Sequence, residues 1–202
     1  MNKIINYGLG NIRAFINLYK SLDIDISVAN SHTDLKNCDK IILPGVGSFD
    51  TAIEKINNSG MRESLDELVL VKKKPVLGIC VGMQIMLSSS EEGKLDGLSW
   101  IKSKVVKFDI NSKLYKIPHM GWNNIIIRND NPLLNNLNDR SRFYFLHSYY
   151  CDINNNNKVL ASTNYQIEFP SVFNYDNIFG IQCHPEKSHG SGLIFLKNFS
   201  KI

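Results

Sequence analysis

The sequence lacks a long apolar run, a metal-type cysteine pair and a strong excess of either charge. No segment approaches the roughly 20 apolar residues of a membrane-spanning helix. Residues 1–7 carry one lysine and no apolar core of a signal peptide. The 23 basic and 19 acidic residues give a net charge of +4, too weak to indicate nucleic acid or a membrane surface as a partner. We therefore expect a soluble, unexported, cytoplasmic protein.

Familiar cofactor motifs are absent as well. The four cysteines, at positions 38, 80, 151 and 183, form no CxxC pair, so neither a metal site nor a disulfide framework is expected. No Gly-Lys-Ser/Thr phosphate loop occurs. A dinucleotide loop at Gly8-Leu9-Gly10 is rejected, because Arg13 occupies the position of the third glycine.

The pattern of the first half favours a parallel α/β core. Short β-branched runs alternate with helical patterns over 202 residues, a length that suits one domain spanning 1–202. The expected strands are 4–7, 24–28, 40–43 and 75–79, and the expected helices are 11–22, 49–57, 61–72 and 81–87.

After residue 97 the runs become more aromatic and are separated by turn clusters. They predict antiparallel additions to the core and a closing helix at 192–201. The expected strands are 104–108, 122–127, 143–149, 159–163, 167–174 and 178–182. The predicted fold class is α/β, one domain with an open mixed sheet and helices on both of its faces.

Cys80 lies where a buried strand meets a helical pattern, in the segment Gly78-Ile79-Cys80-Val81-Gly82. Gly-x-Cys-x-Gly is the thiol version of a nucleophile elbow, in which a tight turn pushes the nucleophile into a crevice. A following helix N-terminus favours the reactive thiolate. The Val81 N–H would point at a developing oxyanion. A buried, inert Cys80 is the alternative, and the two interpretations are about equal on this motif alone.

His184 and Glu186 supply the rest of a triad. A nucleophilic cysteine needs a base, and the base needs a group that fixes its tautomer. In an extended segment, residues at i and i+2 point to the same side, so Glu186 can reach the His184 ring. Cys183 would face the core instead. With the elbow, a Cys-His-Glu site becomes the better interpretation.

A third segment, Pro44-Gly45-Val46-Gly47, ends another expected strand. Successive glycines let backbone N–H groups converge on an anion, so Val46 is a candidate second oxyanion donor beside Val81. A simple tight turn explains the same residues equally well.

Together these motifs resemble the class I, or triad, glutamine amidotransferases, which have a flavodoxin-like fold with a nucleophile elbow. Further segments are similar to the glutaminase subunits of imidazole glycerol phosphate synthases, and they span the chain in the expected order. These segments are Asn6–Asn11, Leu43–Phe49, Ile117–Asn123, Phe145–Tyr150 and His184–Ser188. Departures from the pattern are Asn6 for an acid, Val81 for leucine and Cys183 for an aromatic residue.

The resemblance implies hydrolysis of glutamine to glutamate and ammonia without a metal or organic cofactor. Cys80 would attack the carboxamide, His184 would transfer protons, and Glu186 would orient the His184 ring. Val46 and Val81 would donate to the oxyanion. The resemblance also implies that Gly47 and Gln84 contact the glutamine. Val46 would donate only after a peptide flip triggered by the partner.

The implied partner is a (β/α)8-barrel cyclase subunit that forms a heterodimer with this chain. It would take the ammonia and make imidazole glycerol phosphate and AICAR in histidine biosynthesis. The runs 119–122 and 147–150 are expected at the partner contact, since exposed large apolar side chains commonly mark interfaces. We assign the contact to Met120 and Trp122 in these runs, together with Asn11 and Lys187. Ordinary core strands are the alternative, and it applies to every second residue of each run.

Three competing functions stay open on the sequence alone. A paralogous subunit could supply ammonia to a sugar-amidating synthase of surface polysaccharide biosynthesis, which Asn6 and Val81 would allow. A thiol hydrolase of the same fold could act alone, although its relatives usually carry histidine where Val81 stands. A non-catalytic scaffold is the third, and the intact triad argues against it.

Overall fold

A central eight-stranded sheet organises the computed structural model, which describes residues 1–110 and 114–202. Its strand order is β2-β1-β3-β4-β13-β12-β11-β8. Strands β1, β3, β4 and β13 run parallel, and β12, β11 and β8 continue the sheet antiparallel. The strand bounds are β1 Asn2–Ile5, β2 Ile26–Ala29, β3 Lys40–Gly45, β4 Val76–Cys80, β8 Ile126–Ile127, β11 Val159–Tyr165, β12 Ile167–Tyr175 and β13 Ile178–Ile181.

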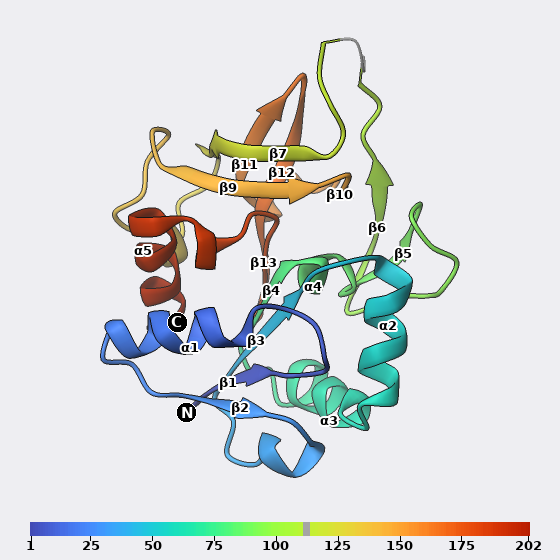
Figure 1. Ribbon diagram of the computed structural model, residues 1–202, viewed down its shortest axis with the longest axis vertical. Coiled ribbons are helices and arrows are strands. Elements are labelled where there is room, and N and C mark those ends of the chain that lie inside the picture. Colours follow the sequence, from blue (N-terminus) through green and yellow to red (C-terminus); the bar gives the residue numbers. More distant parts are fainter. Residues whose placement is uncertain (111–113) are drawn as a thin grey trace.

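Helices cover both faces of this sheet, as the sequence predicts (Figure 1). Helices α1 and α5 lie on one side, and α2 and α3 lie on the other. The helix bounds are α1 Ile12–Ser21, α2 Phe49–Asn58, α3 Arg62–Asp66, α4 Val81–Gln84 and α5 His189–Phe199. Two of them start at side-chain caps, since Asn11 accepts from the Ala14 N–H and Ser48 from the Thr51 N–H. The predicted α/β fold class is confirmed.

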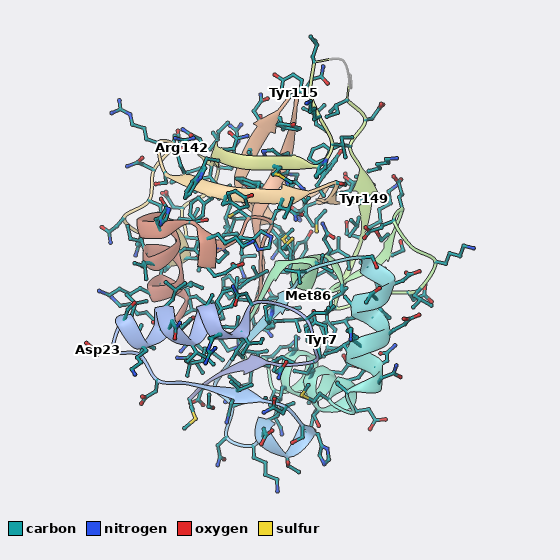
Figure 2. All side chains as sticks on the ribbon, in the orientation of Figure 1. Tyr7, Asp23, Met86, Tyr115, Arg142 and Tyr149 are labelled. Carbon is teal, nitrogen blue, oxygen red and sulfur yellow. The ribbon has the colours of Figure 1, made fainter. Side chains whose placement is uncertain are left out.

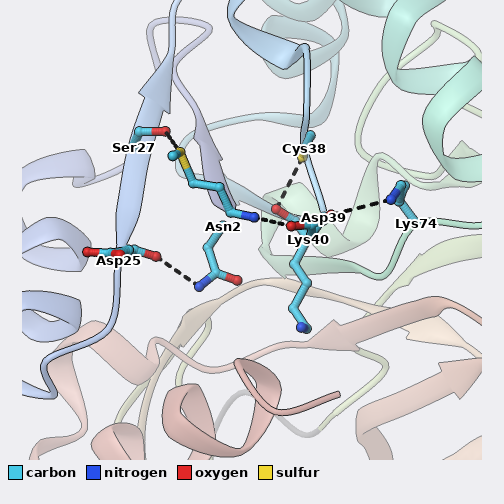
Figure 3. A network of polar contacts seen from close by, with 8 residues as sticks. Asn2, Asp25, Ser27, Cys38, Asp39, Lys40 and Lys74 are labelled. Carbon is cyan, nitrogen blue, oxygen red and sulfur yellow. Dashed lines mark hydrogen bonds and ion pairs between the residues drawn. The ribbon is translucent and has the colours of Figure 1, made fainter.

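A small polar network ties the start of β1 to its two neighbours (Figure 3). The Met1 ammonium pairs with Asp39, which also lies 3.5 Å from the Lys74 ammonium. The Asn2 amide donates to the Asp25 carbonyl at 2.9 Å. These bonds secure the parallel register of β1, which carries the core residues Ile4 and Ile5.

Two smaller sheets lie at the carboxyl ends of the parallel strands. One has the order β10-β6-β5, with β5 Leu87–Ser90, β6 Ile101–Lys107 and β10 Tyr149–Asp152. The other is an antiparallel ribbon of β7 His119–Asn124 and β9 Arg142–His147. In Figure 1 the ribbon crosses β11 and β12 of the central sheet.

Four sequence expectations need correction here. The strand expected at 122–127 is divided at Ile125 between β7 and β8, which belong to different sheets. The strand expected at 178–182 is not an antiparallel addition, because β13 runs parallel to β4 in the middle of the sheet. The helix expected at 81–87 is one turn, Val81–Gln84, and the chain re-enters a strand at Leu87. The single strand expected at 143–149 breaks at Ser148 into β9 and β10, which belong to different sheets.

The second half of the chain contributes many aromatic side chains to the core. Large rings there are almost fully buried, and side chains fill the space around Met86 in Figure 2. Arg142 and Asp23 lie at the periphery. Across the described ranges, 1–110 and 114–202, no helix has the length and apolar character needed to cross a bilayer.

Candidate active site

Cys80 ends β4 in a conformation that few residues adopt. Its φ is 53° and its ψ is −116°, and the one-turn helix α4 begins at the next residue. Such a backbone costs about 1–3 kcal/mol and persists only where the surroundings impose it. The sharp turn places the thiol at the carboxyl end of the sheet, where ligands bind in open α/β folds. Cys80 remains 3% exposed.

The glycines around Cys80 are required by close backbone packing. A Cβ on Gly82 would lie 1.9 Å from the Leu43 carbonyl oxygen, and one on Gly45 would lie 2.3 Å from the Gly82 nitrogen. Thus the end of β3 touches the first turn of α4 backbone to backbone. Gly47 differs, because its φ is +97° and nothing surrounds its missing Cβ, so it serves backbone conformation rather than packing.

His184 follows β13, which is the parallel neighbour of β4. The register pairs Gly180 with Gly78, so two segments distant in sequence end side by side. A 3-10 turn, Pro185–Lys187, then brings the Glu186 carboxylate to 2.8 Å from Nδ1 of His184. The predicted contact exists, but a turn produces it rather than the extended segment expected from the sequence. The second Glu186 oxygen, Oε2, is buried and has no hydrogen-bond partner among the described residues.

The electrostatics favour an imidazolium at His184. Burial lowers its pKa, but the interactions of the ring with Cys80 and its hydrogen bond with Glu186 outweigh burial and raise the pKa from 6.5 to about 10. Since the Nδ1–H donates to Glu186, the other ring nitrogen, Nε2, is the one that faces the thiol. A cationic imidazole beside a cysteine is the arrangement that activates nucleophilic thiols. The short helix α4 contributes less to this than the long helix expected from the sequence would have done.

One cavity of about 280 Å³ brings the predicted site residues together. It is lined by the predicted catalytic residues Cys80 and His184, by the predicted oxyanion donors and by both predicted glutamine contacts. The full lining is Val46, Gly47, Cys80, Val81, Gln84, Glu92, Pro118, Leu146, His147, Ser148, Tyr149, His184 and Lys187. Glu186 stands behind His184, outside the lining.

Buried hydrogen bonds hold the walls of this cavity. The Tyr7 hydroxyl donates to the Pro44 carbonyl at 2.7 Å, which fixes the start of the segment that carries Val46. The Gln84 amide donates to the Tyr149 carbonyl at 3.0 Å and to Gln182 at 3.1 Å. These side chains are therefore fixed before any substrate enters.

Glu92 is a site residue that the sequence did not reveal. Its carboxylate lines the cavity and accepts from the Phe49 N–H at 2.8 Å, at the start of α2. A second link joins the same two segments, because the Asp50 carboxylate of α2 accepts from the Lys94 N–H at 2.9 Å and the Leu95 N–H at 3.1 Å. We call residues 91–95 with the α2 N-terminus the acidic clamp. In the sequence, the run Ser-Glu-Glu-Gly looks like an ordinary solvated turn. Only the strand before it, β5, indicates that this turn lies near the end of a sheet.

The expected partner residues occupy different environments. Met120 is 60% exposed and Trp122 is 39% exposed on β7, and Trp122 stacks on His189 at 5.2 Å. Asn11 is exposed at the start of α1, whereas Lys187 lies in the cavity wall with its ammonium 5.6 Å from the Tyr144 ring.

The histidines of the same motifs are not at the surface. His119 is 3% exposed and His147 is 6% exposed, as the core-strand alternative expects for residues that alternate with exposed ones such as Met120. Within the described residues, no group of three metal-binding side chains occurs, and all four cysteines are free and buried.

Known proteins are similar to this chain along nearly its whole length. The family described as "Glutamine amidotransferase class-I" matches residues 3–201. The imidazole glycerol phosphate synthase subunit HisH of Leptospira interrogans is 49% identical over 201 residues, which cover 98% of each chain. HisH of Bdellovibrio bacteriovorus is 50% identical over 204 residues and covers 100% of each chain.

Solved structures show the same fold at low sequence identity. A structure titled as a glutamine amidotransferase has a TM-score of 0.76 at 15% identity and covers 100% of this chain and 99% of its own. PurLQS from Thermotoga maritima has a TM-score of 0.74 at 16% identity and covers 99% and 97%.

Proposed function

Because the chain belongs to the class-I glutamine amidotransferase family, we propose that it is the glutaminase subunit of an imidazole glycerol phosphate synthase, active in the cytoplasm in histidine biosynthesis. The observation that carries the proposal is the convergence of Cys80 and His184 at one cavity, with Glu186 hydrogen-bonded to the far side of the His184 ring. Full-length identity of about half to HisH proteins supports histidine biosynthesis rather than the amidation of sugars as the pathway.

The first half-reaction forms a thioester. The Cys80 thiolate attacks the carboxamide carbon of glutamine, and the carbonyl π electrons move to oxygen. The N–H groups of Val46 and Val81 stabilise that oxyanion. His184 gives its proton to the amide nitrogen as the C–N bond breaks, so ammonia leaves and a glutamyl thioester remains.

The second half-reaction returns the enzyme to its starting state. Neutral His184 takes a proton from water, whose oxygen attacks the thioester carbon. The C–S bond then breaks, which releases glutamate and regenerates the thiolate beside an imidazolium. Glu186 holds the ring through Nδ1 in both halves.

The cavity suits a zwitterionic amino acid. Glu92 offers a carboxylate for the α-ammonium of glutamine, and Lys187 lies in the same wall as a cation for its carboxylate. Gly47 and Gln84 complete the contacts. The acidic clamp places Glu92 next to the segment of Val46, so substrate binding and the oxyanion donor share one anchor.

The ammonia passes to a (β/α)8-barrel cyclase subunit in a heterodimer, which makes imidazole glycerol phosphate and AICAR. The exposed Met120 and Trp122, with Asn11 and Lys187, form the proposed contact. Nucleotide bound to the partner turns the Val46 peptide toward the oxyanion. Gly45 and Gly47 flank that peptide, and Gly47 already has a positive φ.

Co-purification with the barrel subunit encoded in the same genome, followed by a glutaminase assay with and without its nucleotide, tests the proposal. We expect stimulation by the nucleotide and no turnover in Cys80→Ser, with partner binding retained. Equal rates in all states would refute activation at Val46. Stimulation only by a sugar-amidating synthase would refute the pathway while leaving the chemistry in place.

A further inference from the structure

His119 and His147 form a buried pair for which the proposed chemistry has no use. They are directly opposite in the β7–β9 register, and Nδ1 of His119 lies 2.9 Å from Nε2 of His147. His147 lines the cavity, whereas His184 is the ring beside the thiol. Two imidazoles in direct contact can bond only if one donates and the other accepts.

The surrounding bonds allow one arrangement of the protons. Nδ1 of His147 lies 2.9 Å from the Tyr149 carbonyl, which can only accept, so this nitrogen carries the hydrogen. Nε2 of a neutral His147 is then an acceptor for the Nδ1–H of His119. Nε2 of His119 in turn accepts from the Asn123 amide at 3.2 Å. Both rings are therefore fixed in the Nδ1–H tautomer.

Packing around the pair opposes a further proton. The His119 ring stacks between Phe145, at 4.8 Å, and Tyr165, at 4.1 Å. Burial lowers the pKa of His119 to about 4 and, with the charge of His119, that of His147 to about 3. The charge of the nearby His184 also lowers the pKa of His147 and so opposes an added positive charge on the pair.

The far end of this chain of bonds reaches the substrate pocket. The Tyr149 carbonyl that accepts from His147 also accepts from Gln84 Nε2 at 3.0 Å. The same Gln84 nitrogen donates to Gln182 at 3.1 Å. With both amide hydrogens engaged, the Gln84 oxygen is the atom available to a substrate donor.

We propose that His119 and His147 are positioning residues, a pair of neutral imidazoles of fixed tautomer that holds the Tyr149 carbonyl and, through it, the Gln84 amide in the orientation that glutamine requires. The inference rests on the proposed glutaminase function. It predicts an effect on glutamine binding more than on the chemical step, because neither ring contacts the reacting atoms.

Matched variants at His147 separate the effect of its hydrogen bond to the Tyr149 carbonyl from the effect of the size of its ring. Asparagine keeps an N–H donor near the place of Nδ1, whereas phenylalanine keeps a ring and removes the donor. In the complex with the barrel subunit, we expect His147→Phe to raise the KM for glutamine about tenfold, the usual effect of one lost buried hydrogen bond. The kcat should stay within about threefold, and His147→Asn should restore KM to within about threefold of the original value. His32→Phe, on an exposed turn, is the control.

Long-range proton–nitrogen NMR of the imidazoles in the unsubstituted chain gives a second readout that needs no activity. Both rings should show the neutral Nδ1–H pattern from about pH 7 down to about pH 5.5. An Nε2–H tautomer at either ring, or equal KM values for His147→Phe and His147→Asn, would overturn the proposal. Failure of the glutaminase function would appear differently, as an inactive unsubstituted complex with the NMR pattern intact.

Discussion

Replacing Glu186 with glutamine should separate orientation from charge in the candidate triad. The carboxylate is 2% exposed and lies 2.8 Å from Nδ1 of His184. Glutamine has the same shape, but it is neutral and carries an NH2 group on one side. Glu186 Oε2 has no hydrogen-bond partner among the described residues, so the NH2 group either occupies that unmatched place or faces Nδ1–H and forces the wrong tautomer.

The expected size of the effect comes from the pKa of His184. Burial alone would lower it, yet Cys80 and Glu186 raise it from 6.5 to about 10. A shift of this size corresponds to about 5 kcal/mol in favour of the imidazolium. The carboxylate supplies one charge-assisted hydrogen bond to that ring, worth about 1.5–3 kcal/mol, so Glu186→Gln should lower kcat/KM by on the order of 10- to 100-fold.

The assay is glutamate release by the complex with its barrel partner across a pH series, with thiolate absorbance to follow Cys80. We expect the acid needed to expel ammonia to be lost at lower pH in Glu186→Gln, so the alkaline limb of the rate profile moves toward neutrality. Glu63→Gln, at an exposed position, is the control. A Glu186→Gln complex with kcat/KM within about threefold of the original and an unmoved pH profile would refute the reasoning.

Three further predictions follow from packing, buried titration and the acidic clamp. Gly82→Ala places a Cβ 1.9 Å from a β3 carbonyl, so we expect at least about 2 kcal/mol lower stability in urea unfolding and loss of glutaminase activity; unchanged stability would contradict that packing. Burial lowers the pKa of His119 to about 4, and burial with the charge of His119 lowers that of His147 to about 3. The unfolded chain therefore binds protons below pH 6.5 that the folded chain does not, and unfolding free energy should fall by about 3 kcal/mol from pH 7 to pH 5, less steeply in the His119→Asn/His147→Asn variant. Asp50→Asn weakens the anchor of Glu92 and should raise the KM for glutamine about fivefold with little change in kcat, as one charge-assisted bond requires; an unaltered KM in steady-state kinetics would show that the clamp does not position Glu92.

The first half of the fold was readable because its signals are local. The β-branched runs and helical patterns around Asn11 and Ser48 determine where elements start, and the structure confirms the parallel core there. The helix predicted at 81–87 was too long. A fully buried apolar run shows no periodicity that would distinguish a one-turn helix from the strand that starts at Leu87.

What could not be read was long-range pairing. Whether β13 is parallel or antiparallel depends on its pairing with β4, and the local sequence of β13 does not indicate which strand it pairs with. The break at Ser148 arises because β9 and β10 join different sheets, although the aromatic run is continuous in sequence. Glu92 became visible only through its bond to Phe49, and the burial of His119 only through its stacking.

The adjacency of β4 and β13 has a consequence for engineering. The spacing of thiol and imidazole is set by strand register, which pairs Gly78 with Gly180 and Ile79 with Ile181. All the chain from Ile85 to Asn177 leaves this pair of strands and returns to it, so it is topologically an insertion. Its ribbon and small sheet carry Met120 and Trp122 but also His147 and Tyr149 of the cavity. Exchanging them for those of another amidotransferase would therefore transfer docking preference together with part of the glutamine pocket, while Cys80 and His184 stay in place.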